Sequence, residues 1–433
     1  MQHEQRMAAL AVQRVLAGAS LPVALAAVAD GAATRGHSLV QELAYGTLRY
    51  WGRLDALTRA LAAKPLGDGA VAALVAVAIY QLDHTHAPDF AVVDQAVHAV
   101  TLLDQPRAKS LVNAMLRRYL REREALNQRV VAESPVARWS YPRWWIGRVE
   151  ADHPRHWEAI LEAGNVRPPL TLRVNARVTD RASLAARFAD AGIATRDVGA
   201  IGLVVDVPRV VTELPGFAEG AFAVQDAGAQ LAAPLLGVAD GMRVLDACAA
   251  PGGKAAHLAA LADIELTALD SDAGRLARVD ENLVRLRVAG PRIQTRVGDA
   301  GDPAGWWDGR PFDRILADVP CTASGVVRRH PDAKWLRRKS DLVSFAAQQQ
   351  RLLPALWGTL APGGALLYVS CSVFAAENEH QIKSFMNSHP EALRESITFP
   401  DDCPHLGGQL LPAANDAGHN QDGFFFALLR RRT

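Results

Sequence analysis

The stretch that most constrains the fold of this chain is Val244-Leu-Asp-Ala-Cys-Ala-Ala-Pro-Gly-Gly-Lys254. It begins as a short buried strand that ends in an acid, and Pro251, Gly252 and Gly253 then force a tight turn. From Lys254 onward the spacing of apolar residues predicts a helix. A strand, a glycine-rich turn and a helix N-terminus together make a site where backbone N–H groups face a ligand. The sequence therefore predicts a ligand-binding turn here.

Strands and helices alternate from about residue 240 to the end of the chain. This alternation is typical of an open, mostly parallel sheet. The expected strands are 243–247, 265–270, 292–297, 313–318 and 364–370, with a near-continuously apolar and therefore central strand at 423–429. Such sheets bind ligands beyond the carboxyl ends of their strands. We predict a Rossmann-like α/β domain over residues 237–433.

Three further parts precede this domain. Residues 1–128 are predicted to be all-helical, because apolar residues recur there at helical spacing. Residues 129–165 are predicted to form a linker, and residues 166–236 a small α+β module. The 433 residues are 49% apolar and 21% charged, which is enough material for these cores. The net charge of +1 means that any nucleic-acid contact must come from local patches.

The four cysteines are widely spaced, with no C-x-x-C pair and no histidine at ligand spacing; they are Cys248, Cys321, Cys371 and Cys403. We therefore expect no metal site and no disulfide, and free thiols favour a reducing cytoplasm. The polar N-terminus is not followed by a signal-type apolar stretch, and apolar runs such as 71–80 are too short to span a bilayer. We expect a soluble cytoplasmic protein.

Acidic residues close the expected strands. Asp270 follows the glycine turn by about one βαβ unit, a position that suits the two hydroxyls of a ribose. Asp299 closes the next strand and suits an adenine amino group. A nicotinamide site would need G-x-G-x-x-G, and a P-loop would need glycine at position 248 and Ser or Thr at position 255, none of which is present. S-adenosylmethionine, which has no pyrophosphate, fits better.

Two thiols follow expected strand ends. One lies in Asp318-Val-Pro-Cys321 and the other in Ser370-Cys371-Ser372. Carbon 5 of a pyrimidine is a poor nucleophile, but thiolate attack at carbon 6 makes an enamine that accepts a methyl group at carbon 5. A carboxylic acid at N3 assists this attack. These residues alone do not rank Cys371 above Cys321, and a Pro-Cys nucleophile of the DNA cytosine-5 type would favour Cys321.

Three motifs carry a family resemblance. Asp246–Lys254, Asp318–Cys321 and Tyr368-Val-Ser-Cys-Ser372 resemble the corresponding motifs of the RNA 5-methylcytosine methyltransferases. The run 324–337 resembles the Sun/Fmu type, and the helical first domain is similar to NusB-type RNA-binding domains. The resemblance implies a Rossmann-like methyltransferase domain that uses S-adenosylmethionine, preceded by an all-α NusB-like domain and a small α+β module.

The resemblance also implies residue roles. It makes Cys371 the nucleophile, lets Cys321 assist release of the methylated product, and places Asp318 against the base or the cofactor. The implied cofactor-binding residues are Cys248, Ala249, Ala250, Pro251, Gly252, Gly253, Lys254, Asp270, Asp299 and Asp318. The implied substrate is one cytosine of small-subunit (16S) ribosomal RNA. The sequence departs from the family at Val319, usually Ala or Pro, and at Ser370, usually Thr.

Basic residues offer two candidate RNA contacts. A cluster follows the Cys321 loop and comprises Arg328, Arg329, Lys334, Arg337 and Arg338. Beside a base-modifying site we predict that this cluster contacts phosphates. Arg117 and Arg121, four residues apart on the last helix of the first domain, form a second candidate stripe, for which a solvated helix face is the alternative.

Other functions remain open at this point. A methyltransferase acting on transfer RNA, DNA or a protein side chain is one alternative, although glutamine and adenine-amine methyltransferases need no cysteine. A non-catalytic RNA-binding assembly or antitermination factor is another, as the first domain alone would suggest. We expect a monomer that binds ribosomal RNA and neither a membrane nor a metal.

Overall fold

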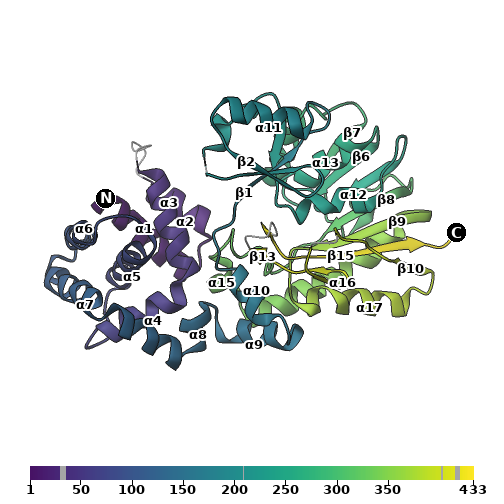
Figure 1. Cartoon of the computed structure of the whole chain (residues 1–433). Helices are drawn as coiled ribbons and strands as arrows, with labels where there is room; N and C mark the ends of the chain where they lie inside the picture. The colour runs from purple at the N-terminus through teal and green to yellow at the C-terminus, as the bar shows by residue number, and fades with distance from the viewer. Residues whose placement is uncertain (30–35, 208, 401–402, 415–419) are drawn as a thin grey trace. The chain divides into compact units, whose positions relative to one another are not determined.

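The computed structural model describes residues 1–29, 36–207, 209–400, 403–414 and 420–433. The chain forms two compact units. The first comprises Met1–Val166 and the inserted segment Val327–Lys339, and the second comprises Arg167–Val326 and Ser340–Thr433. The first is helical and the second carries the labelled strands (Figure 1). None of the helices within the described residues is long and apolar enough to cross a membrane.

The first unit packs around one almost fully apolar helix. Its helices are α1 (Gln2–Leu16), α2 (Leu21–Val28), α3 (His37–Arg49), α4 (Trp51–Leu61), α5 (Gly69–His84), α6 (Asp89–Leu102), α7 (Lys109–Glu133), α8 (Pro135–Trp139), α9 (Arg143–Asp152), α10 (Trp157–Ala163) and the inserted α15 (Ala333–Leu336), with a 3-10 turn η1 (Pro106–Ala108). Helix α5 is buried from Ala73 to Ile79. Gly46 of α3 lets it approach closely, because a Cβ there would lie 1.9 Å from Cζ of Tyr80.

The first unit differs from the prediction in two places. The apolar pattern predicts a single helix over about residues 38–63, but the structure has two helices that meet at Tyr50. The expected linker 129–165 is instead the end of α7 followed by α8, α9 and α10, and it belongs to the first unit. Trp139, Tyr141 and Trp145 in this stretch are buried. Burial of such large rings stabilises a packed element, and this explains why the stretch is not a free connector.

The second unit begins with a small antiparallel sheet of order β2-β3-β1-β4. Its elements are β1 (Leu170–Val174), α11 (Arg181–Asp190), β2 (Thr195–Val198), β3 (Gly202–Val205), η2 (Val211–Glu213) and β4 (Phe222–Val224). Helix α11 begins at the N-cap Asp180, whose side chain accepts a bond from the backbone N of Ser183. Leu172, Phe188 and Phe222 are wholly buried between helix and sheet. The predicted α+β module is confirmed.

The large sheet has the order β11-β12-β15-β9-β8-β5-β6-β7, with β10 also paired to β15. Its strands are β5 (Arg243–Asp246), β6 (Glu265–Asp270), β7 (Ile293–Val297), β8 (Phe312–Asp318), β9 (Leu360–Ser370), β10 (Ala392–Glu395), β11 (His405–Leu406), β12 (Gln409–Leu410) and β15 (Phe424–Arg431). Strands β5 to β9 pair in parallel, and β15 is antiparallel to β9. The predicted, mostly parallel α/β sheet is confirmed.

Helices precede or connect these strands. They are α12 (Ala232–Leu236), α13 (Gly253–Leu261), α14 (Ala273–Arg285), α16 (Lys339–Gly358) and α17 (Glu379–Ser388), with 3-10 turns η3 (Ala229–Leu231), η4 (Pro303–Gly305) and η5 (Ala375–Glu377) and a small hairpin of β13 (Ala413–Ala414) and β14 (Asn420–Gln421). Helix α14 is amphipathic and buries Leu276, Val279 and Leu283. Its N-cap Asp272 accepts a bond from the backbone N of Arg275.

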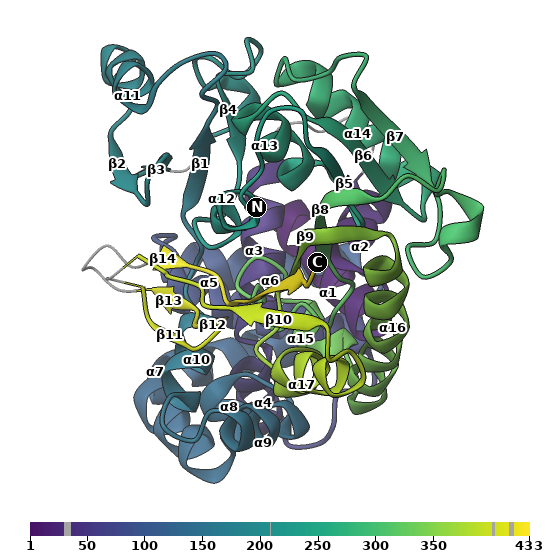
Figure 2. The same cartoon turned by 90° about the vertical axis from the view of Figure 1, so that its right-hand side faces the viewer.

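The strand order reverses at β5. The chain passes from β5 through α13 to β6 on one side, and it later returns on the other side as β8 (Figure 2). The carboxyl ends of parallel strands open into a crevice at such a reversal. The glycine-rich turn after β5 therefore lies where a ligand site is expected.

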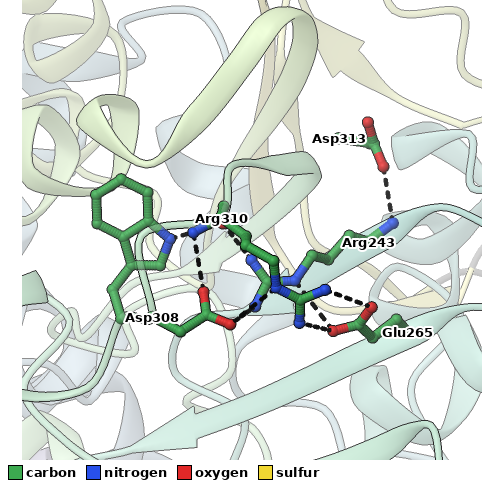
Figure 3. Close-up of polar contacts among 6 residues, drawn as sticks. Arg243, Glu265, Asp308, Arg310 and Asp313 are labelled. Atoms are coloured by element: carbon green, nitrogen blue, oxygen red, sulfur yellow. Dashed lines mark hydrogen bonds and ion pairs between the residues drawn. The ribbon is translucent and has the colours of Figure 1, made fainter.

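The opposite edge of the sheet is tied by ion pairs (Figure 3). Arg243 opens β5, and its guanidinium lies 3.1 Å from Glu265 at the start of β6 and 2.8 Å from Asp308. Its backbone N donates to Asp313 near the start of β8. Arg310 adds a second bond to Glu265, at 2.6 Å. These contacts join the amino ends of three strands, and so they stabilise the sheet at the edge remote from the crevice.

Candidate active site

One cavity of about 240 Å³ collects the residues that follow five strand ends of the second unit. Seven of the predicted site residues line it: Cys248, Ala250, Asp270, Asp299, Asp318, Cys321 and Cys371. The lining also includes residues that we did not predict, among them Ser271, Arg275, Gly298, Pro320, Gln348 and Leu352. Ser271, Gly298 and Pro320 flank predicted strand ends, which is the signal that points to them, whereas Arg275 lies in the first turn of α14. Gln348 and Leu352 come from α16, and no local pattern in that helix distinguishes them.

The glycine turn has a conformation that only glycine accommodates. Gly252 has φ of 97°, in the left-handed region. A Cβ at Gly252 would lie 2.9 Å from Cα of Val279. The turn is also hydrogen-bonded to the next strand, since the backbone N of Ala249 donates to the carbonyl of Leu269 at 2.8 Å. Ala249, Pro251, Gly252 and Gly253 therefore shape the turn rather than line the cavity.

Arg173 of the small sheet supports this turn. Its guanidinium is almost fully buried and donates to the carbonyl of Gly253 and to Oε1 of Gln225, both at 2.6 Å. Burial lowers the pKa of Arg173 to about 9. Sequence reasoning missed this residue because an arginine in an alternating strand gives no sign of the partner it meets 80 residues later.

Asp270 is held firmly at the end of β6. Its side chain is 4% exposed, and Oδ2 accepts a bond from the backbone N of Ala250 at 3.1 Å. Oδ1 accepts another bond from the backbone N of Asp272, also at 3.1 Å. A carboxylate that is fixed in this way is well placed to accept hydrogen bonds from a pair of hydroxyl groups.

Asp299 lies beyond β7 in a more open setting. Its side chain is 49% exposed and pairs with Arg351 at 2.9 Å. The hydrogen bond from Arg351 lowers the pKa of Asp299, and the backbone N of Gly301 adds a further bond. Asp299 and Asp270 thus line the same cavity, but the side chain of Asp270 is buried and that of Asp299 is about half exposed.

Lys254 reaches from the start of α13 to the end of β8. Its Nζ lies 2.6 Å from Oδ2 of Asp318, and the two side chains are 15% and 26% exposed. Burial by itself lowers the pKa of Lys254, but the charge and hydrogen bond of Asp318 outweigh it, and the pKa is raised. Lys254 is therefore an ammonium that orients Asp318, and it does not line the cavity.

Asp246 ends β5 behind this pair. It is 1% exposed, and both of its carboxylate oxygens are buried without a hydrogen-bond partner in the part of the chain that the structure describes. Burial, reinforced by the charge of Asp318, raises the pKa of Asp246 to about 7. An unsatisfied buried carboxylate is costly, and here it is retained directly before the glycine turn. The sequence showed Asp246 as a strand-end acid but assigned it no role.

Two thiols meet at the cavity. The Sγ atoms of Cys321 and Cys371 lie 3.4 Å apart, although 50 residues separate them in the chain. Cys321 is 8% exposed and Cys371 is partly exposed. Contact with Cys371, together with burial, raises the pKa of Cys321 well above that of a free thiol. Two thiols in contact at a cavity lined by carboxylates can divide nucleophilic and proton-transfer tasks.

Cys248 differs from these two. It lines the cavity, but burial and the neighbouring charge of Asp318 raise the pKa of its thiol. A thiol that stays protonated is a weak nucleophile, so Cys248 is poorly suited to act as one. Within the described part of the chain there is no group of three or more His, Cys, Asp or Glu side chains that could hold a metal ion.

The predicted RNA-contacting cluster requires a correction. Lys334 is fully buried in the first unit. Its Nζ donates to the carbonyl of Arg49 at 3.1 Å and to Asn165. The same Nζ lies 4.0 Å from the ring centre of Tyr141. Arg328 is 1% exposed, and its carbonyl accepts a bond from Arg49. The prediction of phosphate contact was wrong for these two residues, because neither side chain has surface to offer.

The other predicted RNA contacts have accessible surface. Arg338 is exposed, and Arg329 and Arg337 are partly exposed. Arg117 and Arg121 are exposed on α7, where Nε of Arg117 donates to Asn113 at 3.1 Å. The basic cluster of the sequence therefore separates into residues that hold the inserted segment and residues that remain at the surface.

Comparison with protein families identifies the same kinds of domain that the sequence pattern predicts. Residues 233–430 match the family described as 16S rRNA methyltransferase RsmB/F. Residues 141–212 match the ferredoxin-like domain of RsmF/B-like methyltransferases, and residues 3–121 match the NusB family. These matches confirm the predicted NusB-like and methyltransferase domains.

Similar proteins span nearly the whole chain. Ribosomal RNA small subunit methyltransferase B of Pseudomonas putida is 45% identical over 98% of this chain and 97% of its own length. The protein of the same name from Vibrio cholerae is 40% identical over 96% and 94%. The solved structure of PH0851 covers 100% of this chain and 99% of its own, with a TM-score of 0.79 at 22% identity, and so shares the fold. A methyltransferase homolog from Pyrococcus horikoshii has a TM-score of 0.59 at 27% identity, covering 69% of this chain and 99% of its own.

Proposed function

Because this chain belongs to the family of 16S rRNA methyltransferases RsmB/F, we propose that it methylates carbon 5 of a cytosine in small-subunit ribosomal RNA. The reaction proceeds through a covalent bond between Cys371 and carbon 6 of the base. The observation that carries this proposal is the 3.4 Å contact between the thiols of Cys321 and Cys371 at a cavity lined by strand-end carboxylates.

The chemistry requires a nucleophile, an acid and a base. The Cys371 thiolate adds to carbon 6 while a protonated group stabilises the charge that develops at N3, so that carbon 5 becomes an enamine carbon. Bound S-adenosylmethionine supplies an electrophilic methyl group to that carbon. A base then removes the proton from carbon 5, the C5–C6 double bond re-forms, and the Cys371 thiolate leaves.

The two thiols differ in how deeply they are buried. Cys321 is the more buried, and its contact with Cys371 raises its pKa. When Sγ of Cys371 forms the bond to carbon 6, it no longer carries the negative charge that opposes ionisation of Cys321. The pKa of Cys321 should then fall, so that its thiol can release its proton to solvent and the resulting thiolate can accept the carbon 5 proton after methyl transfer. This order of events supports Cys371 as nucleophile, as the family resemblance implied, with Cys321 as the group that assists release.

The cofactor site is proposed to follow the cavity lining. The fixed carboxylate of Asp270 would accept the two ribose hydroxyls, and the more open Asp299 would accept the adenine amino group. Ala250 and Cys248 line the same cavity and would contact the ligand through the turn. Asp318, oriented by Lys254, lines the same cavity as Cys321, and there it would contact the target base or the reacting end of the cofactor.

Transfer of radiolabelled methyl from S-adenosylmethionine to deproteinised small-subunit ribosomal RNA, with the labelled base mapped, tests the proposal. We expect label in 5-methylcytosine at one position. Label only in transfer RNA would favour the transfer RNA alternative. Absence of label in either RNA, with RNA binding retained, would favour a non-catalytic assembly factor.

A further inference from the structure

A buried carboxylate joins the two loops that carry the thiols. Glu377, at the end of the short turn η5, is 0% exposed. Its Oε1 accepts a bond from the backbone N of Thr322 at 2.7 Å, and its Oε2 accepts one from Oγ1 of Thr322 at 2.6 Å. Oε2 also accepts a bond from Oγ of Ser372. Thr322 directly follows Cys321, and Ser372 directly follows Cys371, so one carboxylate binds the neighbour of each thiol.

The hydroxyl protons around Glu377 can be assigned. Ser372 donates its single proton to Glu377, so the 2.8 Å contact between Ser324 and Ser372 must be a bond donated by Ser324. The hydroxyl oxygens of both serines also accept backbone bonds, from Val373 at 2.9 Å and Phe374 at 3.0 Å. The loop after Cys371 is thereby bonded to the loop after Cys321 at two serines as well as through Glu377.

The same network reaches the end of β9. Asn378 donates to the carbonyl of Ser372 at 2.8 Å and to Gln409 at 2.7 Å, and it accepts a bond from Ser370. Hydrogen bonds to an ionised group are stronger than those between neutral groups, so the bonds of Glu377 are the strongest connection between the two loops. The remaining bonds hold the Cys371 loop against the sheet.

We propose that Glu377 is a positioning residue of the methyl-transfer site, which holds the loops of Cys321 and Cys371 together so that the two thiols stay in contact. This inference rests on the proposed function in so far as the thiols carry the reaction. The negative charge of Glu377 also raises the pKa of Cys321, which keeps that thiol protonated until Cys371 has reacted. A misplacement of reacting groups by about 1 Å is enough to cost on the order of 100-fold in rate.

Three full-length variants separate position from charge. Glu377→Ala removes the bridge. Glu377→Gln keeps an oxygen for the backbone N of Thr322, and its amide can donate to the hydroxyl of Thr322. It does not replace the bond to Ser372, because that hydroxyl oxygen already accepts from Ser324 and from the backbone N of Phe374. Glu379→Gln is the matched control, since Glu379 lies two residues away, is partly exposed and pairs with Arg394 instead. Circular dichroism and thermal melting establish that each variant is folded.

The first readout is methylation of small-subunit ribosomal RNA. We expect Glu377→Ala to lower kcat by about 100-fold with the KM for RNA within about twofold, because substrate binding is not what the bridge provides. Glu377→Gln keeps the Thr322 side of the bridge and should restore part of that loss, and Glu379→Gln should match the wild type. Equal kcat for Glu377→Ala and the wild type would overturn the proposal.

The second readout needs no methyl transfer. Diamide takes up two electrons and two protons as two thiols join in an S–S bond, so its rate of forming a Cys321–Cys371 disulfide, followed by peptide mass, reports thiol contact. We expect Glu377→Ala to slow this step by about tenfold. An unchanged disulfide rate would refute the bridge even if the wild type methylated no RNA. If Glu377→Ala fails to fold, Thr322→Val combined with Ser372→Ala removes the side-chain bonds to Glu377, and the same two outcomes apply.

Discussion

Lys254 and Asp318 form an ion pair of 2.6 Å that joins the first turn of α13 to the end of β8. The glycine turn and the Cys321 loop are thereby held in one arrangement, although 64 residues separate the two side chains. Both oxygens of Asp246 are buried and lack a hydrogen-bond partner among the described residues, and the charge of Lys254 lowers the pKa of that carboxyl against the burial that raises it.

Replacement of Lys254 by methionine should destabilise the second unit. The variant leaves the carboxylate of Asp318 unpaired in a largely buried setting, which costs roughly 2 kcal/mol once its partial exposure is allowed for. Urea unfolding measures the difference. Lys383→Ala is the control, because its ion pair with Glu379 is long and exposed and should be worth less than about 0.5 kcal/mol. Equal losses for the two variants would contradict a structural role for the Lys254–Asp318 pair.

The two cysteines should give opposite phenotypes on replacement by alanine. Cys371→Ala should abolish methylation, because no bond to carbon 6 can form. Cys321→Ala should allow attack and methyl transfer but hinder release, so that a protein–RNA adduct accumulates and is visible on a denaturing gel. The reverse pattern would make Cys321 the nucleophile.

The raised pKa of Asp246 predicts that the stability of the second unit depends on pH. Its pKa is about 7 in the folded protein against an ordinary 3.8, so between these values the folded state holds a proton that the unfolded state has released. The contribution of Asp246 to the free energy of unfolding is complete below about pH 3.8, and it is lost as the pH rises through 7. Asp246→Asn stays neutral. Its stability relative to wild type should therefore increase by up to about 1.4 kcal/mol per pH unit across this window. Urea unfolding at pH 5 and pH 8 tests this, and a constant difference would contradict it.

Lys334 should matter for stability and not for RNA affinity. Lys334→Ala leaves the carbonyls of Arg49 and Ser140 without their donor and empties a buried volume, a combination worth about 3 kcal/mol of unfolding free energy. The exposed Lys339, at the end of the same segment, is the control and should cost less than about 0.5 kcal/mol on replacement by alanine. A folded, fully stable Lys334→Ala variant with weakened RNA binding would instead support phosphate contact by this residue.

Arg117 and Arg121 should contribute to RNA binding through phosphates. The double replacement by alanine should weaken binding to all sequences alike and reduce the slope of log K against log salt by about 2. Arg59→Ala in α4 is the control, because its charge pairs with Asp55 at 2.9 Å. An unchanged slope would leave the stripe as a solvated helix face.

Local signals in the sequence determined most of the second unit. The strand, glycine turn and helix of 244–261, the strand-end acids and the two cysteines are short-range features. In a parallel sheet such features converge at one edge whatever the remaining chain does. For this reason the sequence alone is enough to bring Asp270, Asp318, Cys321 and Cys371 to one cavity, and to predict the domain classes that the family comparisons confirm.

Tertiary packing decided what the pattern left open. A basic residue is normally expected at the protein surface. Lys334 is nevertheless buried, because segment Val327–Lys339 packs into the first unit among backbone carbonyls that only the fold brings together. In the sequence Glu377 is an acidic residue before a helix, with nothing to distinguish it. In the structure it bridges two loops that lie 50 residues apart in the chain. Charge, turn propensity and periodicity are properties of neighbours in sequence, whereas burial and hydrogen-bond partnership are properties of neighbours in space.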